Sequence, residues 1–327
     1  MVIGTSVCVF ISLLYPIISS VAGFLLLRLL HGFSTGFTPT GLTAYLSDII
    51  PARKRGEAMG LLGTAGTVGM ASGLAIGPSI ANDFGLNVMF YSSSGLAVTS
   101  ILVLFGIKET LSDKQGFSTQ VLKIHKRDLL EPKVLVTCVV MLLTTYSYGA
   151  VFTVVPDFCT YVGIRNEGLP FTFLTVASLS VRLIAGKASD YYGRRKVLLV
   201  STTIGVIGMV VLGLGSTPRD LMIAISLYGL AQGMTSPTLF AWATDLSDEK
   251  HKGRGISSLY IFMEMGIGLG AFTSGFIYGN DPANFMITFF TCGALGVLAF
   301  IYLILNKTKD KMHTTDTGII GDVEQLP

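Results

Sequence analysis

Ten long runs of apolar residues alternate with short polar gaps along this chain of 327 residues. Most of the runs approach or exceed the ~20 residues that an α-helix needs to cross a ~30 Å hydrocarbon core. They cover residues 2–15, 21–46, 58–80, 88–107, 134–160, 169–185, 197–213, 221–243, 257–278 and 285–305. This pattern predicts an all-α integral membrane protein with ten spans, of which the first is the shortest.

The basic residues fix the orientation of these spans. Nineteen of the 23 Lys and Arg residues lie in every second gap, at 53–55, 108–133, 187–196, 250–254 and 307–311. By the positive-inside rule these gaps face the cytoplasm. We therefore predict a multi-pass protein of the plasma (inner) membrane with both termini in the cytoplasm.

Composition narrows the class of protein. A charged fraction of 13% and a mean hydropathy of +0.65 exclude an ordinary soluble domain. The net charge is +3, and most of the basic residues are spread over five short loops instead of forming one basic face. This distribution argues against a nucleic-acid partner. The four cysteines have no C-x-x-C spacing, so neither a disulfide framework nor a metal site is predicted.

The sequence matches one enzymatic motif, but in the wrong structural context. The stretch 32–36 matches G-x-S-x-G, but it lies inside an apolar run and not at a strand-to-helix turn. The chain contains no H-E-x-x-H motif and no phosphate-binding P-loop. We therefore predict no enzyme and no cofactor, with membrane lipid and a small-molecule solute as partners and an ion or solute gradient as the energy source.

An internal repeat divides the chain. The loop at 108–133 is the longest connection and separates an N-terminal half of four spans (1–107) from a six-helix half (134–306), which a polar cytoplasmic tail follows (307–327). The two halves share motifs at offsets of 197 and 199, which pair Gly32, Gly36 and Asp48 with Gly229, Gly233 and Asp245, and Arg55, Gly56 and Gly69 with Arg254, Gly255 and Gly268. Parallel halves are typical of transporters with a substrate site between them, near the midplane.

Three motifs resemble those of the major facilitator superfamily. The segment 186–196 resembles its cytoplasmic G-x-x-x-D-x-x-G-R-[RK] loop, and 28–32 resembles the R-x-x-x-G element of its fourth span. The segment 73–78 resembles the G-x-x-x-G-P core of its antiporter motif, although Ser79-Ile80-Ala81-Asn82 follows Pro78 where the family has a pair of glycines. The residues that match are Gly186, Asp190, Gly193, Arg194, Arg195, Arg28, Gly32, Gly73, Gly77 and Pro78.

This resemblance implies a helical bundle of two pseudo-symmetric halves, similar to a drug/proton antiporter and monomeric. Ten of the family's twelve helices are then present. The four spans of 1–107 correspond to helices 3–6, and the first two helices are lacking.

Two residues inside the spans are proton-coupling candidates. Glu264 lies nine residues beyond Gly255, about 13–14 Å along a helix, and is the only acid deep in any span. We expect its apolar neighbours to desolvate the carboxylate, which suits proton exchange near neutral pH; a structural hydrogen bond is the alternative. Arg28 by resemblance assists proton transfer, or else it pairs with a carboxylate or stacks in an aromatic niche.

The resemblance assigns conformational gating to the loop at 186–196. We expect Asp190 to approach the N-terminus of the span that begins near Gly56, where the positive end of a helix dipole would attract its carboxylate. Gly186, Gly193, Arg194 and Arg195 complete this loop, in which the basic residues could alternatively act only as topology anchors.

Polar and aromatic residues on three spans are candidates for lining the substrate cavity. They are Thr35, Thr38, Tyr146, Tyr148, Tyr228 and Gln232. Aromatic and Met surfaces favour an amphipathic or lipophilic solute. We therefore predict proton-coupled efflux of such solutes by alternating access, with an uptake permease for a small nutrient and a non-transporting membrane remnant or scaffold as alternatives.

Overall fold

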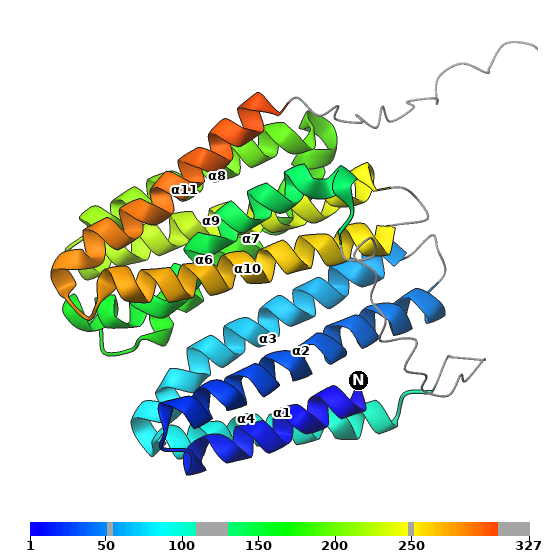
Figure 1. The fold of residues 1–327 in the computed structure, drawn as a ribbon, viewed down its shortest axis with the longest axis vertical. Helices are drawn as coiled ribbons and strands as arrows, with labels where there is room; N and C mark the ends of the chain where they lie inside the picture. The colour runs from blue at the N-terminus through cyan, green and yellow to red at the C-terminus, as the bar shows by residue number, and fades with distance from the viewer. Residues whose placement is uncertain (51–54, 109–129, 248–251, 307–327) are drawn as a thin grey trace, which may run out of the picture. The chain divides into compact units, whose positions relative to one another are not determined.

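The structure is a computed structural model that describes residues 1–50, 55–108, 130–247 and 252–306. In these ranges the chain forms ten α-helices and no strand, which confirms the all-α prediction (Figure 1). The helices are α1 (Val2–Leu14), α2 (Val21–Ile49), α3 (Arg55–Phe84), α4 (Leu86–Phe105), α6 (Leu135–Tyr161), α7 (Gly168–Tyr192), α8 (Arg194–Leu214), α9 (Pro218–Leu246), α10 (Lys252–Tyr278) and α11 (Phe285–Leu305), with 3₁₀ turns η1 (Tyr15–Ile17), η4 (Pro132–Val134) and η6 (Pro282–Asn284).

Each of the ten predicted spans coincides with a helix, but the helices differ in how apolar they are. Within the described ranges, six are long and apolar enough to cross a membrane by length and composition, or seven if the two parts of α7, bent by 45°, count as one span. Helix α1 is shorter, and α3 and α9 contain many Gly, Ser and Thr residues that lower their hydropathy. Helices that line a polar path need not be uniformly apolar.

The chain divides into two compact units, Met1–Leu122 and Lys123–Pro327. The division falls inside the segment 108–133; the assignment of that segment as a cytoplasmic loop stays a prediction. In the N-terminal unit, α1 packs against α2 and α4, and α3 packs against α4. Its core contains Ile11, Tyr15 and Leu27, with Phe90 of α4 packed against them.

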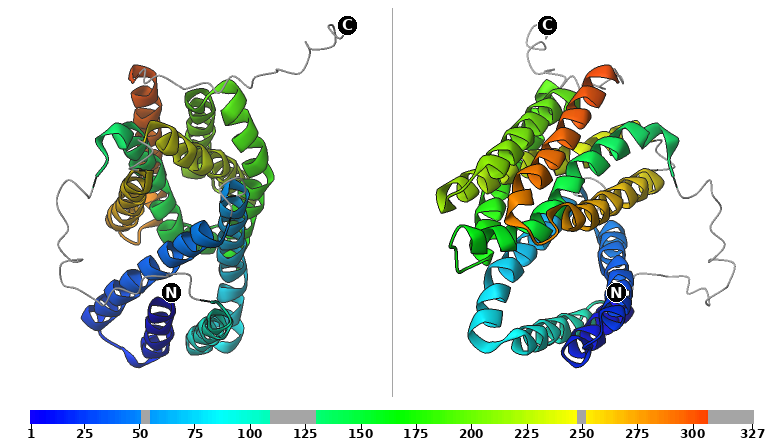
Figure 2. Two further views of the ribbon diagram at one scale, coloured as in Figure 1. Left: turned by 90° about the vertical axis from the view of Figure 1, so that its right-hand side faces the viewer. Right: turned by 60° about the vertical axis from the view of Figure 1, so that its left-hand side comes forward.

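The C-terminal unit has six helices, which Figure 2 shows from two further sides. Helix α10 packs against α6, both α7 and α8 pack against α9, and α11 packs against α8 and α6. Trp242, on α9, is 1% exposed at the centre of a core that includes Met141, Leu198 and Leu303. Residues from α6, α8, α9, α10 and α11 therefore meet in one apolar cluster.

Glycines set the close helix contacts of this unit. A Cβ atom at Gly233 of α9 would lie 2.3 Å from the carbonyl oxygen of Ser178 in α7, and one at Gly270 of α10 would lie 2.0 Å from that of Tyr146 in α6. No side chain fits at such distances, so these positions let two helix backbones approach one another.

Candidate transport site

The loop between α7 and α8 is an ion-pair cluster built on a glycine. Gly193 has a φ of +94°, a conformation that residues with a Cβ rarely adopt, and it separates the two helices. Arg194 then begins α8 and forms ion pairs with Asp190 of α7 and Asp245 of α9, the second with an Nε–Oδ2 distance of 3.0 Å. One guanidinium therefore ties the ends of α7 and α9 to the start of α8.

Arg194 and Asp190 differ in exposure. The Arg194 side chain is 14% exposed and also donates to the Ser189 hydroxyl at 2.6 Å, whereas the Asp190 side chain is 65% exposed. The expected approach of Asp190 to the span that begins near Gly56 would join the two units, each of which is described by itself, so it stays a prediction. Gly186 lies one turn before Asp190 on α7, and an added Cβ there would contact no described atom within 4 Å.

Arg195 makes a second connection at the same end of the unit. Its Nε donates to the carbonyl oxygen of Leu303 at 2.6 Å, and its Nη2 donates to that of Ile304 at 2.5 Å. These carbonyls are among the last of α11 and have no later helical N–H to accept from. Arg195 therefore caps α11 in addition to any effect on topology.

Glu264 lies on α10 with its side chain exposed. Its neighbours on α10 do not cover the carboxylate within this unit, and the expected desolvation stays a prediction. Its charge acts on the phenols of Tyr148 in α6 and Tyr260 in α10. The structure thus places an acid on an apolar helix, within electrostatic range of two phenols.

Arg28 lies in an aromatic niche, one of the alternatives considered for it. Its guanidinium carbon is 5.3 Å from the ring centroid of Tyr15 and 5.2 Å from that of Phe24. Such cation–π contacts contribute about 0.5–1 kcal/mol each when exposed. The niche holds the cation against α2 and the turn η1.

The antiporter-like motif lies on α3. Pro78 is inside this helix, a Cβ added at Gly73 would contact no described atom within 4 Å, and one at Gly77 would meet only the Met89 sulfur, at 4.0 Å. The motif therefore presents a smooth face on which another helix could pack closely.

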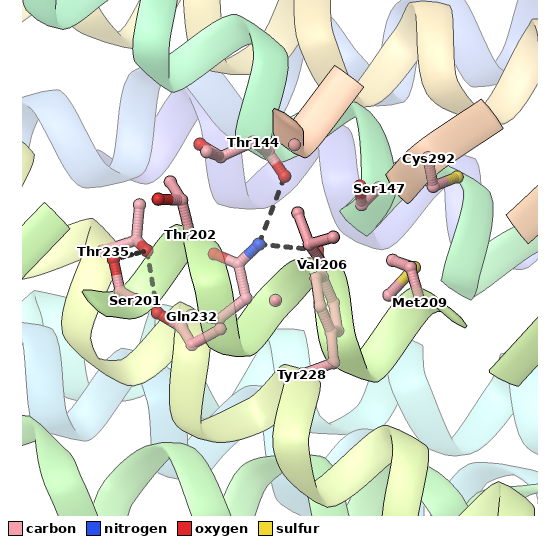
Figure 3. A pocket seen from close by; sticks show the side chains of 13 residues that line it. Thr144, Ser147, Ser201, Thr202, Val206, Met209, Tyr228, Gln232, Thr235 and Cys292 are labelled. Atoms are coloured by element: carbon pink, nitrogen blue, oxygen red, sulfur yellow. Dashed lines mark hydrogen bonds between the residues drawn. The ribbon is translucent and has the colours of Figure 1, made fainter. Parts of the chain in front are cut away.

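Two of the predicted cavity residues meet at a polar pocket inside the C-terminal unit (Figure 3). Gln232 donates from Nε2 to the Tyr228 hydroxyl at 2.6 Å and, more weakly, to the Thr144 carbonyl oxygen at 3.4 Å. The cavity is about 30 Å³, far below the ~300–1,000 Å³ of sites for drug-sized ligands. It is lined by Thr144, Ser147, Ser201, Thr202, Gly205, Val206, Met209, Tyr228, Ala231, Gln232, Thr235, Cys292 and Gly296.

The other predicted cavity residues have different neighbours. Tyr146 is buried and its hydroxyl bonds that of Thr273 in α10, and Tyr148 packs on Phe152 with ring centroids 4.4 Å apart. Thr38 shares a 3.3 Å hydrogen bond with the Thr5 hydroxyl of α1. The Thr35 side chain lies outside what the structure describes. The structure thus joins Tyr228 and Gln232 at one pocket and places Tyr146 and Thr38 in helix contacts.

Sequence reasoning missed several polar residues. Ser201 and Thr235 are buried and share a 2.9 Å hydrogen bond across α8 and α9, and Glu131, 4% exposed, accepts from Arg254 Nε at 2.9 Å. The Ser201-Thr202-Thr203 run inside an apolar segment was a usable signal. No signal could have paired Glu131 with Arg254, because 122 residues separate them.

Metal ligation was also considered. Within the described ranges, no three His, Cys, Asp or Glu residues are grouped so that they could hold a metal ion.

Comparison with known proteins identifies the family. The sequence model described as Major Facilitator Superfamily matches residues 1–181 and 167–318. The "Multidrug resistance protein MdtG" of Serratia proteamaculans is 28% identical over 239 residues, which are 70% of this chain and 57% of that protein. The protein of the same name from Salmonella arizonae is 27% identical over 270 residues, 78% of this chain and 65% of that protein.

The chain thus matches somewhat under two thirds of the length of these relatives. The family match itself extends over almost the whole chain and agrees with the all-helical fold and the internal repeat. The chain belongs to the Major Facilitator Superfamily and is a multi-pass membrane protein of this transporter family.

Proposed function

We propose that this protein is a secondary transporter that exports small lipophilic or amphipathic solutes by alternating access, driven by protons. The observation that carries the proposal is Glu264, an exposed carboxylate on an apolar helix, whose charge acts on the phenols of Tyr148 and Tyr260. An ionisable side chain in a membrane span is costly unless it faces a water-filled cavity or a partner. Such a residue is therefore a candidate for a path of ions or solute. The multidrug resistance named for the relatives supports efflux over uptake.

The proton would act through the charge of Glu264. An ionised carboxylate favours a conformation in which water reaches it, whereas a protonated one tolerates apolar surroundings. Proton binding therefore has a different free energy in two conformations, and that difference is what couples a gradient to a movement.

The cluster around Arg194 is the proposed gate. Asp190 and Asp245 hold this guanidinium on two helices, so a movement of α7 relative to α9 must break one ion pair. Such contacts at partly buried sites are strong enough to bias a two-state equilibrium without locking it.

The solute would contact aromatic surface. Tyr148, Phe152 and Phe171 form a continuous ring stack with centroid distances of 4.4 and 4.7 Å. The pocket beside Gln232 is too small for a whole solute, so at most one polar substituent could enter it. An amphipathic molecule fits this combination. We propose that a single chain transports it in the plasma membrane, with both termini cytoplasmic.

Flux measured in proteoliposomes tests the proposal. Vesicles that contain the full chain are loaded with ethidium as a lipophilic cation, and a pH gradient is imposed. We expect gradient-dependent movement of ethidium that Glu264→Gln abolishes, while Glu167→Gln, a change in the connection before α7, leaves it intact. Retained proton-driven flux in Glu264→Gln would refute the role of Glu264. Absence of any flux in the unaltered chain would favour the scaffold alternative.

A further inference from the structure

The N-terminal unit contains a hydrogen-bonded network that the proposed function does not use. His31 lies ten residues into α2, so it is about 15 Å along the helix and near the middle of a candidate span. Its Nδ1 is 3.0 Å from the Tyr15 hydroxyl of η1, and its Nε2 is 3.3 Å from the Cys8 sulfur of α1. Both ring nitrogens are therefore engaged, by groups from two other elements.

Two residues of this network have counterparts in the internal repeat that line the pocket of the C-terminal unit. At the offset of 197 residues, His31 corresponds to Tyr228 and Cys8 corresponds to Gly205, both of which line the polar pocket of the C-terminal unit. Thr38 and Thr235 correspond in the same way. The centre of each unit is thus polar, but only the N-terminal unit has an imidazole there.

We propose that His31 is a second proton-binding site, held at the centre of the N-terminal unit by Tyr15 and Cys8. The proton binds the ring nitrogen that is the acceptor in the neutral form. A hydroxyl and a thiol can each donate or accept, so the neutral ring keeps both contacts in either tautomer. The imidazolium donates from both nitrogens, to the Tyr15 oxygen and the Cys8 sulfur, so uptake of a proton breaks neither contact.

Arg28 is the charged group that acts on this network. Its guanidinium carbon lies 5.3 Å from the centroid of the Tyr15 ring, and that centroid is 5.9 Å from the centroid of the His31 ring. From α4, Phe90 stacks on Tyr15 and brings no charge. Because two positive charges repel, His31 releases its proton when Arg28 occupies the niche and takes one up more readily when Arg28 leaves it.

This linkage gives Arg28 a physical role. When the Arg28 guanidinium leaves its aromatic niche, His31 would bind a proton more readily. The positive charge of the protonated His31 would then oppose the return of the guanidinium. The role of this exchange in transport rests on the proposed function, whereas proton binding by His31 does not.

Proton binding is measured directly by NMR of the full chain in nanodiscs, with histidine labelled by ¹³C and ¹⁵N. The chain has four histidines, at 31, 125, 251 and 313, and His31→Gln assigns the signal of His31. We expect that signal to change reversibly between neutral and imidazolium shifts as the pH is lowered and raised again. A His31 signal that stays in one charge state while the other three titrate would overturn the proposal and leave His31 as a structural link.

Two further variants keep the test decisive if His31→Gln does not fold. Cys8→Ser preserves a group that donates and accepts, and should leave the titration in place. Arg28→Gln removes the charge, and should move the midpoint of one histidine signal by about half a pH unit or more towards easier protonation. An unmoved midpoint would contradict the linkage to Arg28.

Measurements of flux and of His31 titration together distinguish this proposal from the proposed function. If Glu264→Gln abolishes proton-driven flux and His31 does not titrate, the proposed function stands and the second proton site is refuted. If His31 titrates but no flux occurs, the proton site stands and the transport role is refuted. If both hold, His31→Gln should retain flux and change its dependence on pH.

Discussion

Helices α2 and α9 carry the same Gly-x-x-x-Gly pair, yet the two pairs have different surroundings. In α9, added Cβ atoms at Gly229 and Gly233 would each lie 2.3 Å from a carbonyl oxygen of α7. At Gly32 and Gly36 of α2, an added Cβ would have no described atom within 4 Å. The same local sequence is thus a tight backbone contact in α9, whereas in α2 no described atom lies within 4 Å of the added Cβ atoms.

Helices α3 and α10 show a different relation. Gly266 and Gly270 of α10 contact α6 too closely for a side chain, and their counterparts at the offset of 199 are Thr67 and Ala71. At Gly69 and at its counterpart Gly268, an added Cβ would meet no described atom within 4 Å. A glycine spacing therefore predicts that a helix can be approached closely, but it does not predict which helix approaches.

The largest expected effect tests an ion pair of the C-terminal unit. Arg254→Gln leaves Glu131, 4% exposed, without its cation, and breaking a buried pair typically costs about 3–5 kcal/mol. We expect a large loss of unfolding free energy in detergent-based denaturation. Arg55→Gln, the corresponding change in the N-terminal unit, is the matched variant. An equal loss of unfolding free energy in Arg55→Gln would show that the N-terminal unit has an equivalent ion pair of its own.

Matched glycine substitutions test the comparison itself. Gly233→Ala forces a methyl group against the Ser178 carbonyl and should destabilise the protein by about 1–3 kcal/mol. Gly36→Ala adds a methyl group that would meet no described atom within 4 Å, and it should be neutral or stabilise α2 by up to ~1 kcal/mol. Thermal unfolding of the two variants measures this. Equal destabilisation would mean that Gly36 also forms a close helix contact.

A smaller effect is expected where the two units agree. Thr235 bonds Ser201 across α8 and α9 at 2.9 Å, and Thr38, its counterpart, bonds Thr5 across α1 and α2 at 3.3 Å. Removing one such hydrogen bond costs about 0.5–1.5 kcal/mol. Thr235→Val should therefore cost slightly more than Thr38→Val in the same unfolding assay. If only one variant loses stability, the side-chain hydrogen bond contributes to stability in only one of the two units.

These contacts show how far the sequence could be interpreted. Apolar length located all ten helices, and the offset between repeats found the equivalent positions before any geometry was known. The exposure of Glu264 could not be predicted, because covering a side chain depends on which helix packs beside it. The Tyr228–Gln232 pair was proposed as cavity lining, but its inward direction follows from the packing of α9 on α8.

The smallest effect concerns the first turns of α2 and α9, whose N-terminal caps differ at repeat-related positions. Thr217 caps α9 and Asp220 completes a capping box, whereas the equivalent pair at α2 is Ser20 and Gly23, with no carboxylate. Hydrogen bonds from the Thr217 hydroxyl and the Ser216 backbone N–H hold the pKa of Asp220 below its usual value.

The sign of the pH effect follows from that lowered pKa. The capping carboxylate contributes stability above the pKa of about 3.9 that Asp has in the unfolded chain, and this contribution is lost as the pH falls through the lower folded value. Asp220→Gly converts the α9 cap to the form found at α2. We expect the variant to be slightly less stable near neutral pH and to lose less stability below about pH 4 than the unaltered chain. Parallel pH profiles of unfolding would mean that the exposed cap at α9 contributes no more than the Ser20 cap at α2.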